Sequence, residues 1–125
     1  MSGDWSLLQA AAESEVQQIL RALPRDLRTE ARRLPVTFER RPGEELQEDG
    51  IEPDTLGLFV GEAFADGEPG GVPLPPQIIL FLENIRDVAE GDEAVYRKEI
   101  RTTFLHELGH YLGLDEIDLE ERGLD

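Results

Sequence analysis

One helical pattern, over residues 93–113, constrains the fold more than any other part of the chain. Its apolar side chains recur at spacings of four, four and three, at Ile100, Phe104, Leu108 and Tyr111. Gly113 follows the last apolar residues, and a glycine there favours a left-handed helix C-cap. The segment therefore predicts one helix whose apolar stripe packs on a core and which ends in a sharp turn.

The other edge of this helix carries the only two histidines of the chain, His106 and His110, with Glu107 between them. Residues four apart lie on one face of a helix, so both imidazoles can reach a single cation. Glu107 projects about 100° around the helix from His106, which places its carboxylate beside that cation. This H-E-x-x-H arrangement is typical of zinc-dependent hydrolases, most often peptidases, in which the glutamate handles protons. The competing interpretation is an amphipathic helix with two surface histidines.

The run from His106 to Leu119 resembles the short bacterial zincin-like metallopeptidases, also called minimal or MMP-like zincins. Those proteins carry H-E-x-x-H-x-x-G-x-x followed by an acidic residue. The similarity continues upstream through residues 56–61, 74–82 and 90–92, and it is loose over the first part of the chain. The resemblance implies a Zn²⁺ cofactor and hydrolysis of peptide bonds by a metal-activated water, with Glu107 as general base. Short or unfolded peptides would be the substrates, because a small domain has room for few subsites.

The resemblance also implies a third zinc ligand, ten residues after the first histidine. That position holds Glu116, where the family usually has an aspartate, and Asp115 stands one residue earlier. Either carboxylate is an acceptable zinc ligand. We favour Glu116 on register, because the turn at Gly113 would bring it back toward the histidines, with Asp115 as the alternative. Both residues could instead be solvated acids of an acidic tail.

Length and composition limit the remaining possibilities. A chain of 125 residues fits one domain, here residues 1–125. The absence of cysteine excludes a disulfide framework and a thiolate metal site. The first residues lack the basic and apolar regions of a signal peptide, and no apolar stretch approaches the length of a membrane span. We therefore expect a cytoplasmic protein with no membrane partner.

The net charge of −16 argues against nucleic acid as a partner, because phosphate binding requires positive charge. Residues 21–41 differ from the rest, with seven arginines and three acidic residues, 7 − 3 = +4. This basic segment could pair with acidic groups of the same protein or with a partner. The simpler interpretation is a solvated helix face.

The remaining segments predict an α+β domain. Helical patterns cover residues 6–23, 26–33 and 117–122 in addition to the motif helix. The apolar face of the first of these consists of Leu8, Ala12, Val16, Ile19 and Leu23. Strand patterns cover residues 36–39, 56–64 and 78–82. Loops are expected at residues 42–55 and 66–76, and a connection with room for one turn of helix is expected at residues 84–92.

This order predicts a small three-stranded sheet covered by helices on one face, with an N-terminal helix, a C-terminal H-E-x-x-H helix and a short terminal helix. The resemblance makes it a minimal zincin-like domain. In that arrangement an edge strand beside the metal takes the substrate as an added antiparallel strand. Residues 78–82 or residues 58–63 would form that edge, and the sequence does not decide between them.

Two functions remain open from the sequence. The first is the zinc-dependent peptidase, and the second is a non-proteolytic metal-binding or protein-interaction module that keeps the fold and binds through residues 42–55 and 66–76. The carboxylate of Glu107 favours the enzyme, because a structural zinc site requires no free acid there. Tyr111 could supply a donor near the metal, but we interpret it as a core residue. Tyr96 stays unassigned.

Overall fold

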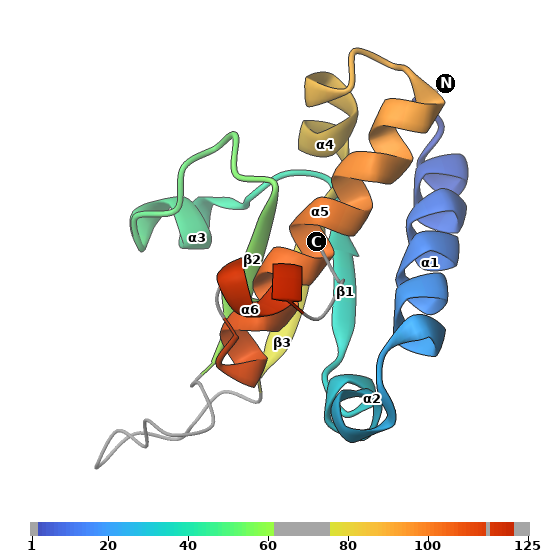
Figure 1. Cartoon of the computed structure of the whole chain (residues 1–125). Coiled ribbons are helices and arrows are strands. Elements are labelled where there is room, and N and C mark those ends of the chain that lie inside the picture. The colour runs from blue at the N-terminus through green and yellow to red at the C-terminus, as the bar shows by residue number, and fades with distance from the viewer. Residues whose placement is uncertain (1–2, 62–75, 115, 122–125) are drawn as a thin grey trace.

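The computed structural model describes residues 3–61, 76–114 and 116–121 (Figure 1). The described residues contain both helices and a three-stranded sheet, which confirms the predicted α+β class. In chain order they are α1 (Trp5–Ala22), α2 (Arg25–Arg32), β1 (Val36–Glu39), α3 (Glu44–Glu48), β2 (Gly57–Val60), β3 (Gln77–Phe81), α4 (Leu82–Val88), α5 (Glu93–Leu112) and α6 (Glu116–Glu121).

The three strands form one sheet in the order β1-β3-β2. β1 pairs with β3 in parallel, and β2 pairs with β3 antiparallel, with Gly57 opposite Leu80. Because β3 is central, residues 78–82 do not form the edge strand, and this alternative of the sequence analysis was wrong. β2 is an edge of the sheet in the described part of the chain. The predicted strand 56–64 is described only as far as residue 61, and its last residues lie outside the description.

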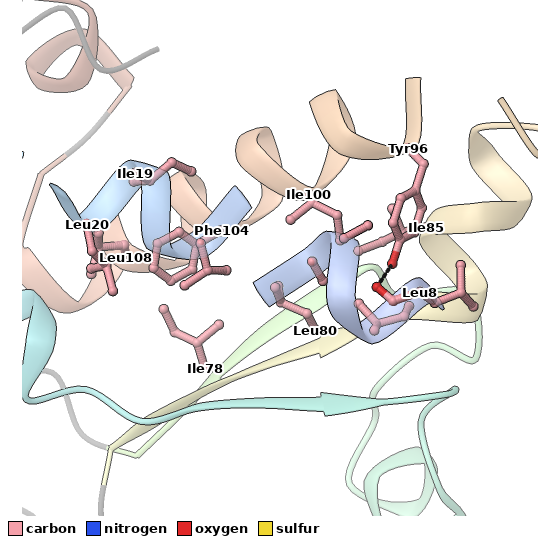
Figure 2. Packing of buried hydrophobic residues seen from close by; sticks show 14 of the residues in the cluster. Leu8, Ile19, Leu20, Ile78, Leu80, Ile85, Tyr96, Ile100, Phe104 and Leu108 are labelled. Atoms are coloured by element: carbon pink, nitrogen blue, oxygen red, sulfur yellow. Dashed lines mark hydrogen bonds between the residues drawn. The ribbon is translucent and has the colours of Figure 1, made fainter. Parts of the chain in front are cut away.

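Helices α1 and α5 pack together on one face of the sheet and enclose the core (Figure 2). The predicted apolar face of α1 is buried, and so are three of the four stripe residues of α5. Tyr96 is also fully buried, and its hydroxyl donates to the carbonyl of Leu8 at 2.8 Å. Burial raises the pKa of Tyr96, so this hydroxyl stays protonated in the core. Tyr96 therefore ties α5 to α1 at a distance from the histidines.

Short helices occupy the predicted loop 42–55 and the predicted connection 84–92, where one helical turn was expected. α3 lies within residues 42–55, where Glu44 and Glu45 occupy its first turn and their charge complements the helix dipole. α4 follows β3 without a break and takes up most of the predicted connection at residues 84–92. The predicted loop 66–76 lies outside the described residues except for its last residue. None of the described helices has the length and apolarity to span a membrane.

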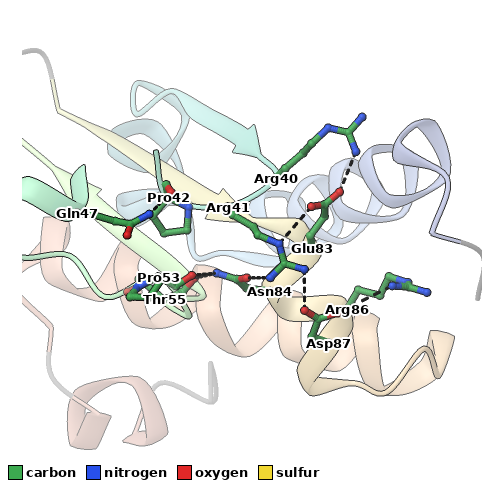
Figure 3. Close-up of polar contacts among 10 residues, drawn as sticks. All are labelled: Arg40, Arg41, Pro42, Gln47, Pro53, Thr55, Glu83, Asn84, Arg86 and Asp87. Carbon is green, nitrogen blue, oxygen red and sulfur yellow. Dashed lines mark hydrogen bonds and ion pairs between the residues drawn. The ribbon is translucent and has the colours of Figure 1, made fainter. Parts of the chain in front are cut away.

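The basic segment makes contacts within the protein at its C-terminal end. Arg40 pairs with Glu83 at 2.8 Å, and Arg41 pairs with Asp87 at 2.9 Å (Figure 3). Arg40 also lies over the ring of Trp5, 4.7 Å from its centroid. Pairing with acidic groups of the same protein thus accounts for part of the positive charge of residues 21–41.

A buried carboxylate joins the two long helices. Glu15 of α1 is 4% exposed and accepts from Arg97 at 3.1 Å and from Arg101 at 2.9 Å, both on α5. Burial by itself raises the pKa of Glu15, but the hydrogen bonds and charges of Arg101 and Arg97 outweigh burial and lower it. Glu15 is therefore ionised at neutral pH and stabilises the α1–α5 contact.

We expect Glu15→Gln to lower the free energy of unfolding at pH 7 by about 1–3 kcal/mol, as loss of a charge-assisted hydrogen bond does. Because the folded-state pKa lies below the unfolded one, this contribution is full above the unfolded pKa of about 4.3 and is lost as pH falls through the folded value. Urea unfolding of both proteins at pH 7 and at a series of pH values below 4.5 measures the contribution of Glu15 to the free energy of unfolding. Equal acid sensitivity of the variant and wild type would contradict the assignment.

Candidate metal centre

Local sequence defines both ends of the helix that carries the histidines. At its start the Asp92 side chain accepts from the N–H of Val95 at 3.0 Å and caps the first turn. At its end Gly113 adopts the left-handed conformation with φ of 72°, and the N–H of Leu114 donates to the carbonyl of Gly109 at 2.8 Å. The predicted turn at Gly113 is therefore present, immediately after the H-E-x-x-H residues.

The three motif side chains converge at the C-terminal half of α5. His106 and His110 have ring centroids 4.6 Å apart, and Nδ1 of His110 lies 3.4 Å from Oε2 of Glu107. One nitrogen or oxygen from each of the three residues lies within 4.8 Å of the others. The histidines are exposed, whereas the Glu107 side chain is only 12% exposed. Within the described ranges, this is the one cluster of histidine and acidic side chains with metal-binding spacing.

These donors fit a zinc ion by their chemistry and their spacing. Imidazole nitrogen binds zinc at about 2.0–2.1 Å, so two ligand atoms on one ion lie no more than about 4 Å apart. Donor atoms already within 4.8 Å reach that separation by a small rotation of exposed side chains. The contact of His110 Nδ1 with Glu107 also leaves the opposite ring nitrogen, Nε2, for a metal.

Strand β2 lies directly against the helix turn that carries Glu107. A Cβ atom on Gly57 would lie 2.5 Å from Thr103 Cγ2 and 3.5 Å from Glu107 Cγ, so only a glycine fits this approach of strand to helix. One turn later the ring of Phe59 on β2 meets the ring of Tyr111 on α5, with centroids 5.8 Å apart. Tyr111 is half-buried against the core, in agreement with its interpretation as a packing residue.

We expect Gly57→Ala to destabilise the protein by about 1–3 kcal/mol, as overpacking of a close contact does. The clashing methyl group belongs to a β-branched residue with a stiff side chain, so the strand rather than Thr103 must move. Urea unfolding gives the change in free energy. Thr103→Ser removes that methyl group, and the double variant should therefore recover most of the lost stability.

Gly43→Ala is the matched control for this prediction. Gly43 has φ of −75°, and a Cβ atom there meets no atom within 4 Å. Gly43 is the N-cap of α3, where alanine is less favourable than glycine, but no side chain clashes there, so its loss of stability should stay below about 1 kcal/mol. Equal effects of Gly57→Ala and Gly43→Ala would refute the close approach of β2 to α5.

The third ligand stays a prediction. Glu116 is the first residue of α6, which contacts α5, but its side chain and the whole of Asp115 lie outside the described part of the structure. The structure thus brings together His106, Glu107 and His110 and leaves the choice between the two carboxylates to experiment.

An H-E-x-x-H helix packed beneath a small sheet, with an antiparallel strand along the motif, is the architecture of a zincin-like domain. The model of the family described as zincin-like metallopeptidase matches residues 31–124, and the chain belongs to this family. A search of curated proteins finds no match to the sequence. The family resemblance inferred from the motif is therefore confirmed. The family implies a metal ion, and the His-Glu-His cluster is a group of side chains that could hold one.

Sequence reasoning missed two residues that bear on the site, one beside it and one that holds the segment leading to it. Gly57 is a glycine inside an apolar strand pattern, and this pattern does signal a close backbone approach. Asn84 is one of two polar residues in the described chain that are fully buried, the other being Glu15. Nothing in the sequence around Asn84 distinguishes it from a surface residue of a connection.

Proposed function

We propose that this protein is a zinc-dependent peptidase that acts on short or unfolded peptides. The observation that carries the proposal is the convergence of His106, Glu107 and His110 beside the edge strand β2. Membership of the zincin-like metallopeptidase family supports it. Under this proposal the two histidines hold the zinc ion, with a carboxylate from Glu116 or Asp115 as third ligand.

Each residue of the site has a distinct chemical role in this proposal. Zinc, when bound, polarises the scissile carbonyl and lowers the pKa of a water molecule. Glu107 takes the proton of the attacking water at its carboxylate and transfers it to the leaving amine, as general base and then general acid. Its 12% exposure limits competition from bulk solvent, and its contact with His110 holds the carboxylate at the motif.

The free edge of β2 provides a place for the peptide main chain. The N–H of Phe81 donates to the carbonyl of Leu56, so residues 56, 58 and 60 bond inward to β3. The main-chain groups of Gly57 and Phe59 consequently point to the outer edge, and no strand of the described chain pairs with them. An extended peptide that adds antiparallel to β2 would use these groups next to Glu107.

The charge of the protein bears on its partners. A net charge of −16 disfavours nucleic acid and favours basic or neutral peptides, because the acidic surface repels other acidic molecules. We propose a peptide or unfolded protein as the substrate and no nucleic acid or membrane partner, in the cytoplasm.

Metal analysis and a peptide-cleavage screen test the proposal. The wild-type protein, purified without chelator, should contain about one zinc ion per chain and should cleave members of a broad peptide library. Removal of zinc by a chelator should abolish cleavage, and added zinc should restore it. A zinc-loaded protein that cleaves no peptide would instead support the non-proteolytic metal-binding or interaction module.

A further inference from the structure

Asn84, in the first turn of α4 just after β3, uses both of its side-chain N–H donors and its carbonyl oxygen in hydrogen bonds. It is 4% exposed, and its Nδ2 donates to the carbonyls of Pro53 at 2.8 Å and Thr55 at 2.9 Å (Figure 3). Its Oδ1 accepts from Nη1 of Arg41 at 2.6 Å. Two carbonyls on one side and a guanidinium on the other define the orientation of the amide, since only Nδ2 can donate.

These partners belong to the two ends of one loop. Arg41 lies after β1 and immediately before the segment 42–55. Pro53 and Thr55 lie at the end of that segment, just before β2. The segment carries six acidic residues and no lysine or arginine, so its own charges repel one another. Asn84 therefore holds together the two ends of an acidic loop whose charges repel one another, and it attaches both ends to the first turn of α4, directly after the central strand β3.

β2 begins two residues after this attachment, at Gly57. β2 is four residues long and has one neighbouring strand in the described chain, so its pairing alone gives weak constraint. The carbonyl of Thr55 accepts from the Asn84 side chain, and the carbonyl of the next residue, Leu56, accepts from the N–H of Phe81. Gly57 follows immediately, at the point where β2 meets Thr103 and Glu107.

We propose that Asn84 is a positioning residue for peptide hydrolysis. It fixes the position of the outward main-chain groups of Gly57 relative to the carboxylate of Glu107. This inference rests on the proposed peptidase function. Asn84 itself does not contact Glu107 or the histidines. It acts through the segment 53–57, and a shift of that segment would misalign the bound peptide with the general base, where a displacement of about 1 Å can cost about a hundredfold in rate.

The test compares Asn84→Ala with Tyr96→Phe in the full-length, zinc-loaded protein. Tyr96→Phe also removes one buried bond from a side chain to a carbonyl, but the bond joins α5 to α1 and does not involve β2. Amide hydrogen exchange of Leu58 and Val60, whose N–H groups bond to β3, should be at least about tenfold faster in Asn84→Ala than in the control. If Asn84→Ala does not fold, the isosteric Asn84→Asp, which loses both donors, replaces it.

Steady-state kinetics separates positioning from a purely structural role. Asn84→Ala should lower kcat about tenfold or more and change KM less than about threefold, because the strand edge remains but its alignment is lost. Tyr96→Phe should leave both constants near the wild-type values. Unchanged kcat in Asn84→Ala, with or without faster exchange at β2, would overturn the proposal.

The two proposals fail in distinguishable ways. If wild-type protein cleaves no peptide, the peptidase function fails, and with it the kinetic role of Asn84. The exchange measurement then still shows whether Asn84 anchors β2. If wild-type protein is active and Asn84→Ala behaves as the control does, the function stands and the positioning role alone is refuted.

Discussion

Glu107→Gln is expected to reduce kcat for peptide hydrolysis by about 10²–10⁴-fold, the usual contribution of a general acid–base group. The substitution preserves the size of a side chain that is 12% exposed and packed near Gly57, so the fold should be unaffected. Zinc content should stay at the wild-type level, because Glu107 handles protons and is not proposed as a ligand. Kinetics with a cleaved library peptide and metal analysis of the same samples measure both quantities.

Glu99→Gln is the matched control for this substitution. Glu99 lies on the same helix, two turns before Glu107, and is not part of the His-Glu-His cluster. The same loss of negative charge there should leave kcat within a small factor of wild type. Full activity of zinc-loaded Glu107→Gln would exclude Glu107 as the general base, and loss of zinc from it would make Glu107 a ligand.

His110→Ala should abolish stoichiometric zinc binding, because it leaves a single histidine at the site. The His110 side chain is 54% exposed, so its removal should change the unfolding midpoint little. Among the carboxylates, Glu116→Gln should weaken zinc affinity by about ten- to a hundredfold or more, and Asp115→Asn much less. Competition titrations against a chelator rank the three variants.

Each alternative result for the carboxylates has its own meaning. A large effect of Asp115→Asn with little effect of Glu116→Gln would shift the ligand register by one residue. No effect of either would leave two protein ligands, which is fewer than a catalytic zinc site of this type uses. Retention of stoichiometric zinc by His110→Ala would remove the His-Glu-His cluster as the metal centre.

Local patterns account for the parts of the fold that were predicted. α5 was predicted because its apolar stripe and the glycine at its C-terminal end, Gly113, are signals that act within a few residues. The same holds for α1, and for the approximate location of each strand. The cluster of His106, Glu107 and His110 follows from helical spacing alone, and a helix places these residues together whatever the rest of the chain does.

Only the tertiary structure decided which strand is the edge. Residues 57–60 and 77–81 are both apolar strand segments, and their pairing order depends on contacts between residues far apart in sequence. Helix α3 was missed and α4 was expected only as a single helical turn for a related reason, since short helices are stabilised by their tertiary contacts and carry little periodic signal.

The sequence by itself determined the motif helix, its turn at Gly113 and the juxtaposition of His106 and His110, because all three depend on the geometry of a single helix. The tertiary structure decided what lies beside that helix. Gly57 contacts Glu107, although about fifty residues separate them in the sequence. Asn84 joins both ends of the loop 42–55, which precedes Gly57. Such contacts are selected by packing and by the need to satisfy buried polar groups, and neither is encoded in local spacing.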